Sequence, residues 1–600
     1  MIPLLVVTLL AQLPTPPVPP AGRFVQSVEV SVASLDAVVT DEKGQRVPGL
    51  TAADFEILED GKRKEISNFF EAGAPERTAG PTGPAPAPAT SPTLELPRAT
   101  YVVLIDNIHL QPGARNAVFE SLEAFLRREL GPNVQAAVAT NGQGGFRLRS
   151  PVTGDADALV RLLRTVANEE SSGGSFIVAE RNQVLSAIDT AGGHISDQIQ
   201  SSVGPDSEPA PNPTPGAGGG GAPQQAPAPR PPGGVVSRHA QALQNVWPQV
   251  RSYSIERVRD LETTLSAVRI LASRMSGLEG RKVLFLVSGN LPLAPGLEVR
   301  EYFHEAVRTK ISGGQSFQSQ IRSDPESTFD RTSLFGETAS AAAAAGFSVF
   351  VFDGKGAGPA GGLADSRMSR QSLDTLAFRS NDESMMRSLA ESTGGLAAIG
   401  RNRLGDILDQ ISEDARRYYS LGYATDPLDP KKKSRSVEVR VKRAGLTIRW
   451  QRTAVPRNFA ERLTLSAVTA LFTPRIENPL RAKLRATPIQ EGKKLFHMVK
   501  ASIPWATLTL LPDGGKRRGV LLLNAAFLTD ADTVSDVPPR RANFSVDATQ
   551  IEASRGQEML WETKLEIPVN ARRISIALTD ETARATSYFQ ADLPSSAPPK

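Results

Sequence analysis

The residue best placed for chemistry is Asp106, which ends the apolar run Tyr101–Ile105. A short, uniformly apolar run followed at once by a helical pattern is typical of a strand buried in a parallel sheet. A carboxylate at the end of such a strand lies at the rim of the sheet. There it can accept backbone N–H groups, cap the next helix or contribute hard oxygen to a cation such as Mg²⁺.

Other chemistry-bearing residues give no support for catalysis. The chain has no cysteine, which excludes disulfides, thiolate metal sites and cysteine nucleophiles. No serine lies in a Gly-x-Ser-x-Gly motif, and Ser288, which follows the predicted strand Val283–Val287, has no evident histidine partner. The glycine-rich run Gly354–Gly358 does not open a helix, so we interpret it as a loop and not as a dinucleotide site. The histidines are few and scattered, which argues against a histidine-built metal site: His109, His194, His239, His304 and His497.

The elements that must position Asp106 alternate between strands and helices from residue 98 to about 453. This alternation predicts an α/β domain with a mainly parallel sheet. Its first helix carries an apolar face at helical spacing, and further strands are predicted over Val134–Ala139 and Phe347–Phe352. Residues 204–234 are more than half Pro and Gly, which predicts a disordered insertion in a surface loop.

Three segments precede this domain. Residues 1–22 read as a leader, because the apolar run Met1–Ala11 has the length of a signal-peptide core and is too short to span a bilayer. Alternating valines and an Asp-Gly turn at Asp60 predict a small β unit over 23–71. The Pro- and Ala-rich residues 72–97 read as a linker.

From Arg462 to the end of the chain the sequence shows no helical pattern, so we expect no helix there. Short apolar segments at wide spacing, such as Val520–Asn524 and Arg573–Leu578, predict a β-sandwich over 460–594. The net charge of +4 comes from 68 basic and 64 acidic residues, and this balance predicts no nucleic-acid partner. The basic run Lys431–Arg435 is interpreted as a solvated turn.

Several segments in order resemble one known family. The segment that runs from Val39 to Lys62, with Gly44, Asp54 and Gly61, is similar to the amino-terminal signature of bacterial VWFA-related domain proteins. The same holds for Leu389-Ala-Glu-Ser-Thr-Gly-Gly395 and for Glu413-Asp-Ala-Arg-Arg-Tyr-Tyr-Ser-Leu-Gly-Tyr423. The resemblance covers residues 24–453. It implies a von Willebrand factor A (VWA), Rossmann-like domain that binds or scaffolds proteins, often in exported proteins.

The resemblance also implies where a cation would bind. VWA domains that hold Mg²⁺ use Asp-x-Ser-x-Ser, a threonine from a second loop and an aspartate from a third. Here Ile108 and Leu110 stand at the two serine positions and Gly289 stands at the second aspartate. Only Asp106 and Thr153 remain as ligands, with Asn107, Ser288 and Asn290 as neutral substitutes. We therefore expect no metal and no other cofactor.

We expect a non-enzymatic, exported protein, periplasmic or extracellular, without an integral membrane span. An unidentified protein partner would dock on the sheet rim through loop contacts. The residues assigned to this partner-binding rim are Asp106, Asn107, His109, Thr153, Ser288 and Asn290. Two alternatives remain open: a Mg²⁺-dependent adhesion module with non-standard ligands, and an envelope hydrolase with a site between domains.

Overall fold

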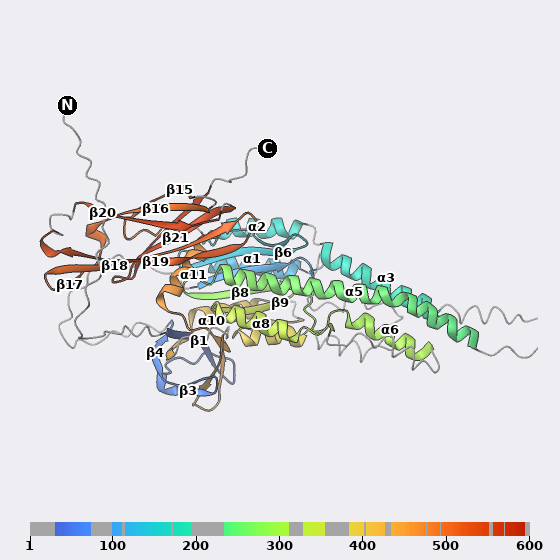
Figure 1. Cartoon of the computed structure of the whole chain (residues 1–600). Helices are drawn as coiled ribbons and strands as arrows, with labels where there is room; N and C mark the ends of the chain where they lie inside the picture. Colours follow the sequence, from blue (N-terminus) through green and yellow to red (C-terminus); the bar gives the residue numbers. More distant parts are fainter. Residues whose placement is uncertain are drawn as a thin grey trace, which may run out of the picture.

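The computed structural model is a mixed α/β protein (Figure 1). The predicted leader (1–22), nearly all of the linker (72–97) and of the insertion (204–234), and most of the Gly354–Gly358 and Lys431–Arg435 segments lie outside the described residues. The structure describes residues 31–73, 99–110, 115–169, 172–193, 233–310, 328–354, 383–400, 404–425 and 434–593, apart from 474, 476, 492–493, 551–555 and 569.

The central element is a six-stranded, mostly parallel sheet with the order β10-β9-β8-β5-β6-β7. The strands pair in parallel except β7, which returns antiparallel beside β6. Numbered within this sheet, the order is that of a doubly wound α/β sheet, which reverses direction between its first and fourth strands, here β5 and β8. The strands are β5 (Ala99–Asp106), β6 (Val134–Gly142), β7 (Gly145–Leu148), β8 (Arg281–Ser288), β9 (Phe347–Asp353) and β10 (Ala397–Ala398).

Helices cover both faces of this sheet, as the alternating sequence predicts. Every residue of β5 is buried, so both sides of the strand are covered by other elements. One face packs against α1 (Asn116–Glu129), α2 (Ala156–Asn168) and α10 (Gly405–Arg416). The other packs against the inner part of α5 (Gly233–Arg274), α8 (Thr332–Ala344) and a helical segment over 383–392.

A helical arm extends from this sheet, and the sequence did not predict it. It consists of α3 (Ser172–Gly193), the first part of α5 and α6 (Leu297–Lys310), which enclose a core that includes Ile188, Val250 and Phe303. With 42 residues, α5 is roughly 63 Å long, and Figure 1 shows it running from the sheet along the whole arm. Helix α6 lies between β8 and α8 in the chain. Among the described helices, none has the length and apolarity that crossing a membrane requires.

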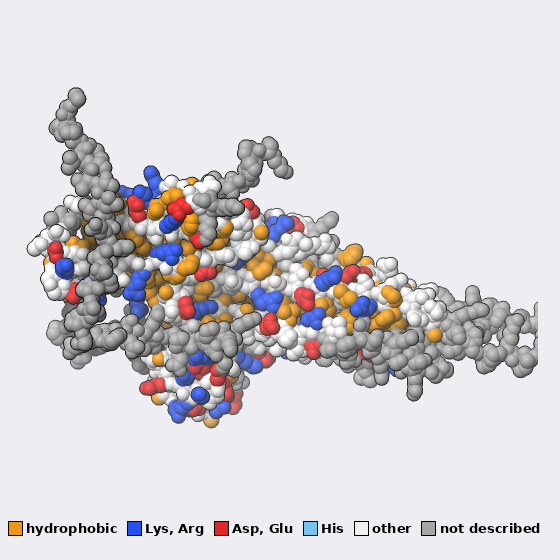
Figure 2. Space-filling model, viewed as in Figure 1, with side chains coloured by type: hydrophobic (Ala, Val, Ile, Leu, Met, Phe, Trp, Pro, Cys, Tyr) orange, Lys and Arg blue, Asp and Glu red, His pale blue; other side chains and the backbone are white. Residues whose placement is uncertain are grey.

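The amino-terminal β unit is built from the chain segments that precede and follow the elements of the central sheet. β1 pairs with β11 and β13, and β2 pairs with β12, so the predicted small unit over 23–71 also contains strands from the predicted α/β domain. Figure 2 shows many charged side chains on its surface. Its strands form two four-stranded antiparallel sheets: β1 (Ser31–Asp41), β2 (Phe55–Glu59), β3 (Lys62–Lys64), β4 (Ile66–Glu71), β11 (Tyr419–Thr425), β12 (Arg435–Val441), β13 (Leu446–Trp450) and β14 (Thr453–Ala454).

Buried ion pairs join this unit to the α/β unit. The Arg281 guanidinium at the start of β8 lies 2.8 Å from the Asp36 carboxylate on β1. Asp414 of α10 accepts from Arg449 of β13 at 2.6 Å and also pairs with Arg46. Removing one partner of a buried pair leaves an uncompensated charge, so these contacts fix the orientation of the two units.

The carboxyl-terminal β unit consists of two antiparallel sheets around one core, in which Val499 and Ile503 face residues such as Leu523 and Ile576. One sheet has the order β15-β16-β20, and the other has the order β17-β18-β21-β22 with β19 also paired to β18. The strands are β15 (Lys483–Glu491), β16 (Lys494–Pro504), β17 (Leu511–Asp513), β18 (Lys516–Thr529), β19 (Val534–Asp547), β20 (Glu558–Glu566), β21 (Ala571–Asp580) and β22 (Ala585–Asp592).

The expectation that no helical segment lies beyond Arg462 is wrong. Helix α11 (Phe459–Ala470) starts at a capping box in which the Asn458 side chain accepts from the Glu461 N–H and the Glu461 carboxylate accepts from the Asn458 N–H. The helix packs Ala467 and Leu471 against the β18–β21 sheet. It also contacts the end of α5, where the Gly277 N–H donates to the Thr469 hydroxyl at 2.9 Å. A Cβ on Gly277 would lie 2.3 Å from the Leu465 carbonyl oxygen, so glycine is required at this contact.

The shared core of the amino-terminal β unit gives a testable prediction. Ile57 on β2 is fully buried, and Ile57→Ala should lower the free energy of unfolding of this unit by about 2–5 kcal/mol through the cavity it leaves. Hydrogen exchange measured by mass spectrometry should rise in β11 and β12 as well as in β2. The control Leu560→Ala, at a side chain that is 74% exposed, should leave exchange unchanged. Faster exchange confined to residues 31–71 would contradict the shared core.

Candidate functional site

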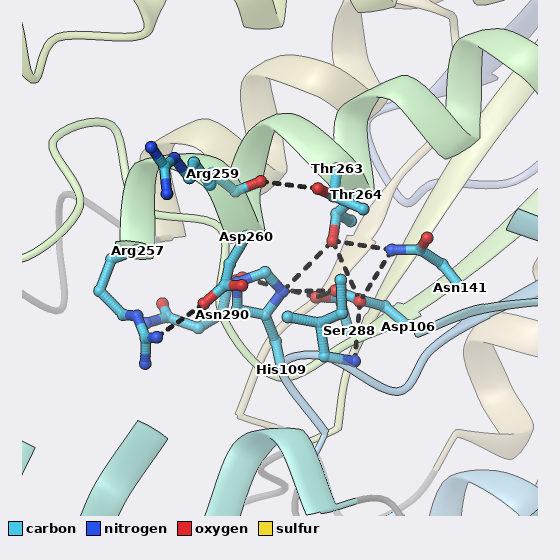
Figure 3. Close-up of polar contacts among 11 residues, drawn as sticks. Asp106, His109, Asn141, Arg257, Arg259, Asp260, Thr263, Thr264, Ser288 and Asn290 are labelled. Carbon is cyan, nitrogen blue, oxygen red and sulfur yellow. Dashed lines mark hydrogen bonds and ion pairs between the residues drawn. The ribbon is translucent and has the colours of Figure 1, made fainter. Parts of the chain in front are cut away.

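The candidate site lies at the carboxyl edge of the parallel sheet, where β5 and β8 end side by side. Asp106 closes β5, next to Asn141 near the end of β6 and to Ser288 at the end of β8. The Thr264 side chain reaches the same point from the last third of α5, and the His109 side chain reaches it from the loop after β5. We call Asp106, His109, Asn141, Thr264 and Ser288 the Asp106 cluster (Figure 3).

The cluster surrounds a carboxylate with no solvent exposure. One Asp106 oxygen accepts from the Thr264 hydroxyl at 3.0 Å and from the Ile108 N–H at 3.2 Å. The other accepts from the Ser288 hydroxyl at 2.7 Å and lies 2.7 Å from His109 Nδ1. The Asn141 side-chain amide lies 3.5 Å from the first oxygen and donates to Thr264 at 3.2 Å. Both oxygens of Asp106 are therefore engaged by the protein itself.

These contacts decide the ionisation of Asp106. Burial by itself would raise the pKa of the carboxyl, but the positive charge of His109 and the hydrogen bonds from His109, Ser288 and Thr264 outweigh it and hold the pKa below its usual value. The site is thus built to keep Asp106 charged. The donors to this buried charge come from four separate segments of the chain, so the carboxylate holds these segments together.

The residues present do not fit a divalent cation. Ile108 and Leu110, at the two positions that the resemblance to VWA domains assigns to serines, are buried apolar side chains. A Cβ on Gly289 would lie 2.3 Å from the His109 carbonyl oxygen, so the backbone leaves no room for a third-loop aspartate. Amide oxygens of Asn107, Asn141 and Asn290 are buried without a donor, but they are neutral. Neutral oxygens around one already engaged carboxylate are a weak ligand set against the hydration shell of Mg²⁺.

The structure gathers most of the predicted rim residues. Asn107 follows Asp106 and donates its N–H to the Asn141 carbonyl at 2.8 Å. Asn290 lies beside His109 in Figure 3. Thr153 does not join them, because it bridges Ala136 at the opposite end of β6, roughly 17 Å along the strand from Asn141. There its hydroxyl accepts from the Asp155 N–H at 3.1 Å, just before α2. The assignment of Thr153 to the rim is therefore wrong.

The cluster does not form a catalytic triad. The Ser288 hydroxyl donates to Asp106, and the His109 ring nitrogen that could be its base is directed to the same carboxylate. A serine nucleophile needs a hydrogen bond to its base, with the acid behind that base. Within the part of the chain that the structure describes, no group of three or more His, Cys, Asp or Glu side chains could hold a metal ion.

Beside the cluster is an open cavity of about 340 Å³, which we call the rim pocket. It is lined by Ile108 and by the β6–β7 turn at Gly142. Its walls come from the start of α3, with Phe176 and Ile177, and from α5. Phe176 is 59% exposed, which is unusual for a large aromatic side chain at a cavity. The α5 wall carries charged side chains: Glu256, Arg257, Arg259 and Asp260.

Several residues of this site were not found from the sequence. Asn141 carries a usable signal, because it ends an apolar strand next to Asp106 as Ser288 does. Thr264, Arg257 and Asp260 carry none, since each lies inside a long helix whose position over the sheet depends on tertiary packing. Strand ends therefore indicate only the part of the site that lies on the sheet, and the part on α5 depends on how the helix packs.

Comparison with protein-family models and with curated proteins finds no match for this chain. Geometry alone therefore supports a functional interpretation of the Asp106 cluster and the rim pocket. The cluster offers a buried, internally bonded anion, and the pocket offers an open surface with apolar and charged walls. Of the two, only the pocket has space for another molecule.

The lowered pKa of Asp106 predicts a pH dependence. The folded state holds fewer protons on this group than the unfolded chain, so its stabilisation is full above the ordinary pKa of 3.8 and is lost as pH falls through the lower folded pKa. Asp106→Ala should cost about 3–5 kcal/mol at pH 7, and the difference from wild type should shrink below pH 4 in urea unfolding. Asp157→Asn, at an exposed ion pair with Arg127, should cost under ~1 kcal/mol. An Asp106→Ala difference that does not change with pH would contradict the assignment.

Proposed function

We propose that this chain is a non-enzymatic protein-interaction or scaffolding protein of the cell envelope. Its α/β unit would be a VWA-like domain whose sheet rim receives a protein partner without a bridging cation. The single observation that carries the proposal is the position of the rim pocket, which opens at the carboxyl edge of the sheet beside the end of β5.

The strand order supports a binding role for this edge. In open α/β sheets, ligands bind outside the carboxyl ends of the strands at the point where the strand order reverses. Here the order reverses between β5 and β8, the two strands that end in Asp106 and Ser288. An order that reverses here, with an antiparallel edge strand, is also compatible with the proposed VWA-like fold. The step from fold to interaction is analogy, to which the exposed Phe176 adds a specific anchor.

The Asp106 cluster supports docking without a metal. A bridging cation needs carboxylate oxygens that are free to bind it, whereas both oxygens of Asp106 accept hydrogen bonds from the chain. The cluster would then act as a rigid base for the loops above it. Partner contacts would come from the pocket walls and from the exposed part of the rim.

The remaining parts of the proposal concern the flanking segments. The two packed antiparallel sheets of the carboxyl-terminal β unit support the assignment of a β-sandwich, which would place a second surface at the other end of the molecule. Export rests on the leader-like residues 1–22 and on the resemblance to VWFA-related proteins. It predicts a periplasmic or extracellular partner.

Exposed phenylalanines allow a matched test of partner docking. The full chain would be immobilised and used to capture proteins from an envelope extract, and each captured protein would then be purified and measured in pairwise binding. Phe176→Ser, at 59% exposure in the pocket wall, should weaken binding of the true partner about tenfold or more. Phe70→Ser, at 61% exposure on β4, should leave it unchanged. If every captured protein binds both variants equally well, docking at the rim is refuted.

Calorimetry distinguishes the proposal from a Mg²⁺-dependent adhesion module. Titration of Mg²⁺ or Mn²⁺ into the full chain should give no binding heat, because the candidate ligands are engaged or neutral. Partner binding should also persist in a chelator. Cation binding that is present in the wild type and lost in Asp106→Ala would establish the alternative instead.

A further inference from the structure

The rim pocket has two walls of opposite character, and its chemistry points to a class of ligand. Ile108, Phe176 and Ile177 form an apolar wall, and the α5 wall carries charged side chains. Figure 3 shows Arg257 and Asp260 directed toward one another below α5, whereas the Arg259 side chain leaves the helix in a different direction. A ligand in this pocket would therefore meet apolar surface on one side and charge on the other.

Carboxylates outnumber guanidiniums around Arg257, because Glu180 adds a third acid next to the pocket and the Arg259 side chain is directed away from this group. Arg257 Nη2 lies 3.0 Å from Asp260, 3.2 Å from Glu180 and 3.9 Å from Glu256. One guanidinium cannot neutralise three carboxylates. Burial first, and then the neighbouring acidic side chains, raise the pKa of Glu180 and of Asp260, although Arg257 acts in the opposite direction. Additional positive charge at this wall would be favourable.

A second observation concerns Arg257 itself. The residue is only 8% exposed, yet its Nε and Nη1 atoms are buried without an acceptor. Buried donors without a partner are costly, and a bound molecule that draws the Arg257 side chain toward the pocket and brings an oxygen acceptor would remove this cost. A peptide carbonyl is a neutral acceptor and adds no negative charge beside the three carboxylates. The carboxylates of the site therefore favour a cation, and Arg257 favours a neutral oxygen acceptor.

We propose that the rim pocket receives a lysine or arginine side chain from an extended segment of the protein partner. This inference rests on the proposed function and specifies the chemistry of the partner. The aliphatic stem would pack on Ile108, Phe176 and Ile177, as long basic side chains do on apolar surfaces. The charged head would meet Glu256 and Asp260, and a carbonyl of the same segment would accept from Arg257.

Fluorescence anisotropy with labelled peptides tests the assignment on the full chain. Three decapeptides of Gly and Ser would differ only in carrying three Arg, three Leu or three Glu residues. The Arg peptide should bind at least tenfold more tightly than the Leu peptide, and the Glu peptide should not bind. Glu256→Gln, at 44% exposure, should weaken the Arg peptide several-fold. Glu438→Gln, at 49% exposure beside Arg440 on β12, should not change it.

Three results would overturn the assignment: no binding of the Arg peptide, tighter binding of the Glu peptide, or equal losses in Glu256→Gln and Glu438→Gln. Equal losses in the two variants would show that the Arg peptide is attracted to acidic surface in general. Failure here is distinguishable from failure of the proposed function. A partner whose binding depends on Phe176, combined with no preference for the Arg peptide, would refute only the basic ligand. If the binding of no captured partner depends on Phe176, docking at the rim is itself refuted.

Discussion

The rest of the α/β unit depends on one buried carboxylate. Asp106 has no exposure, and its charge is compensated only because donors from the loop after β5, from β8 and from α5 converge on it. The low dielectric of this environment makes each hydrogen bond strong and each missing donor costly. The position of α5 over the sheet and the path of the loop at His109 are therefore fixed together.

A rigid base of this kind separates the residues that stabilise the fold from the proposed docking surface. The Asp106 cluster is closed to solvent, whereas the adjacent rim pocket is open and has buried donors without acceptors. Functional surfaces are where unsatisfied groups persist, because a bound partner supplies what the chain leaves out. The same division recurs between units. Ion pairs such as Asp36–Arg281 hold the amino-terminal β unit in place and take no part in lining the pocket.

Local sequence patterns predicted the strands and helices of the sheet but not their long-range partners. The apolar run before Asp106 and the helical face of α1 are periodic signals, and the structure confirms both elements. Nothing local to β2 indicates that it pairs with β12, because pairing across almost 380 residues leaves no periodic trace. The helical arm is not predicted, because α3 and α5 flank a Pro- and Gly-rich stretch that carries no helical signal of its own. α11 was missed although Asn458 and Glu461 form a recognisable capping box.

The interleaved amino-terminal β unit has a consequence for how the chain is made. β1 pairs with β11, so the first strands emerge from the ribosome long before their partners at residues 419–454 exist. At about 5–20 residues per second, this interval lasts roughly 20–80 s. During that time β1 lacks both of its partners and β2 is paired only with β3, so exposed strand edges remain, a condition that favours aggregation. A protein with this topology benefits from a holding chaperone during synthesis, and its α/β unit can finish folding before the β unit closes around both of its ends.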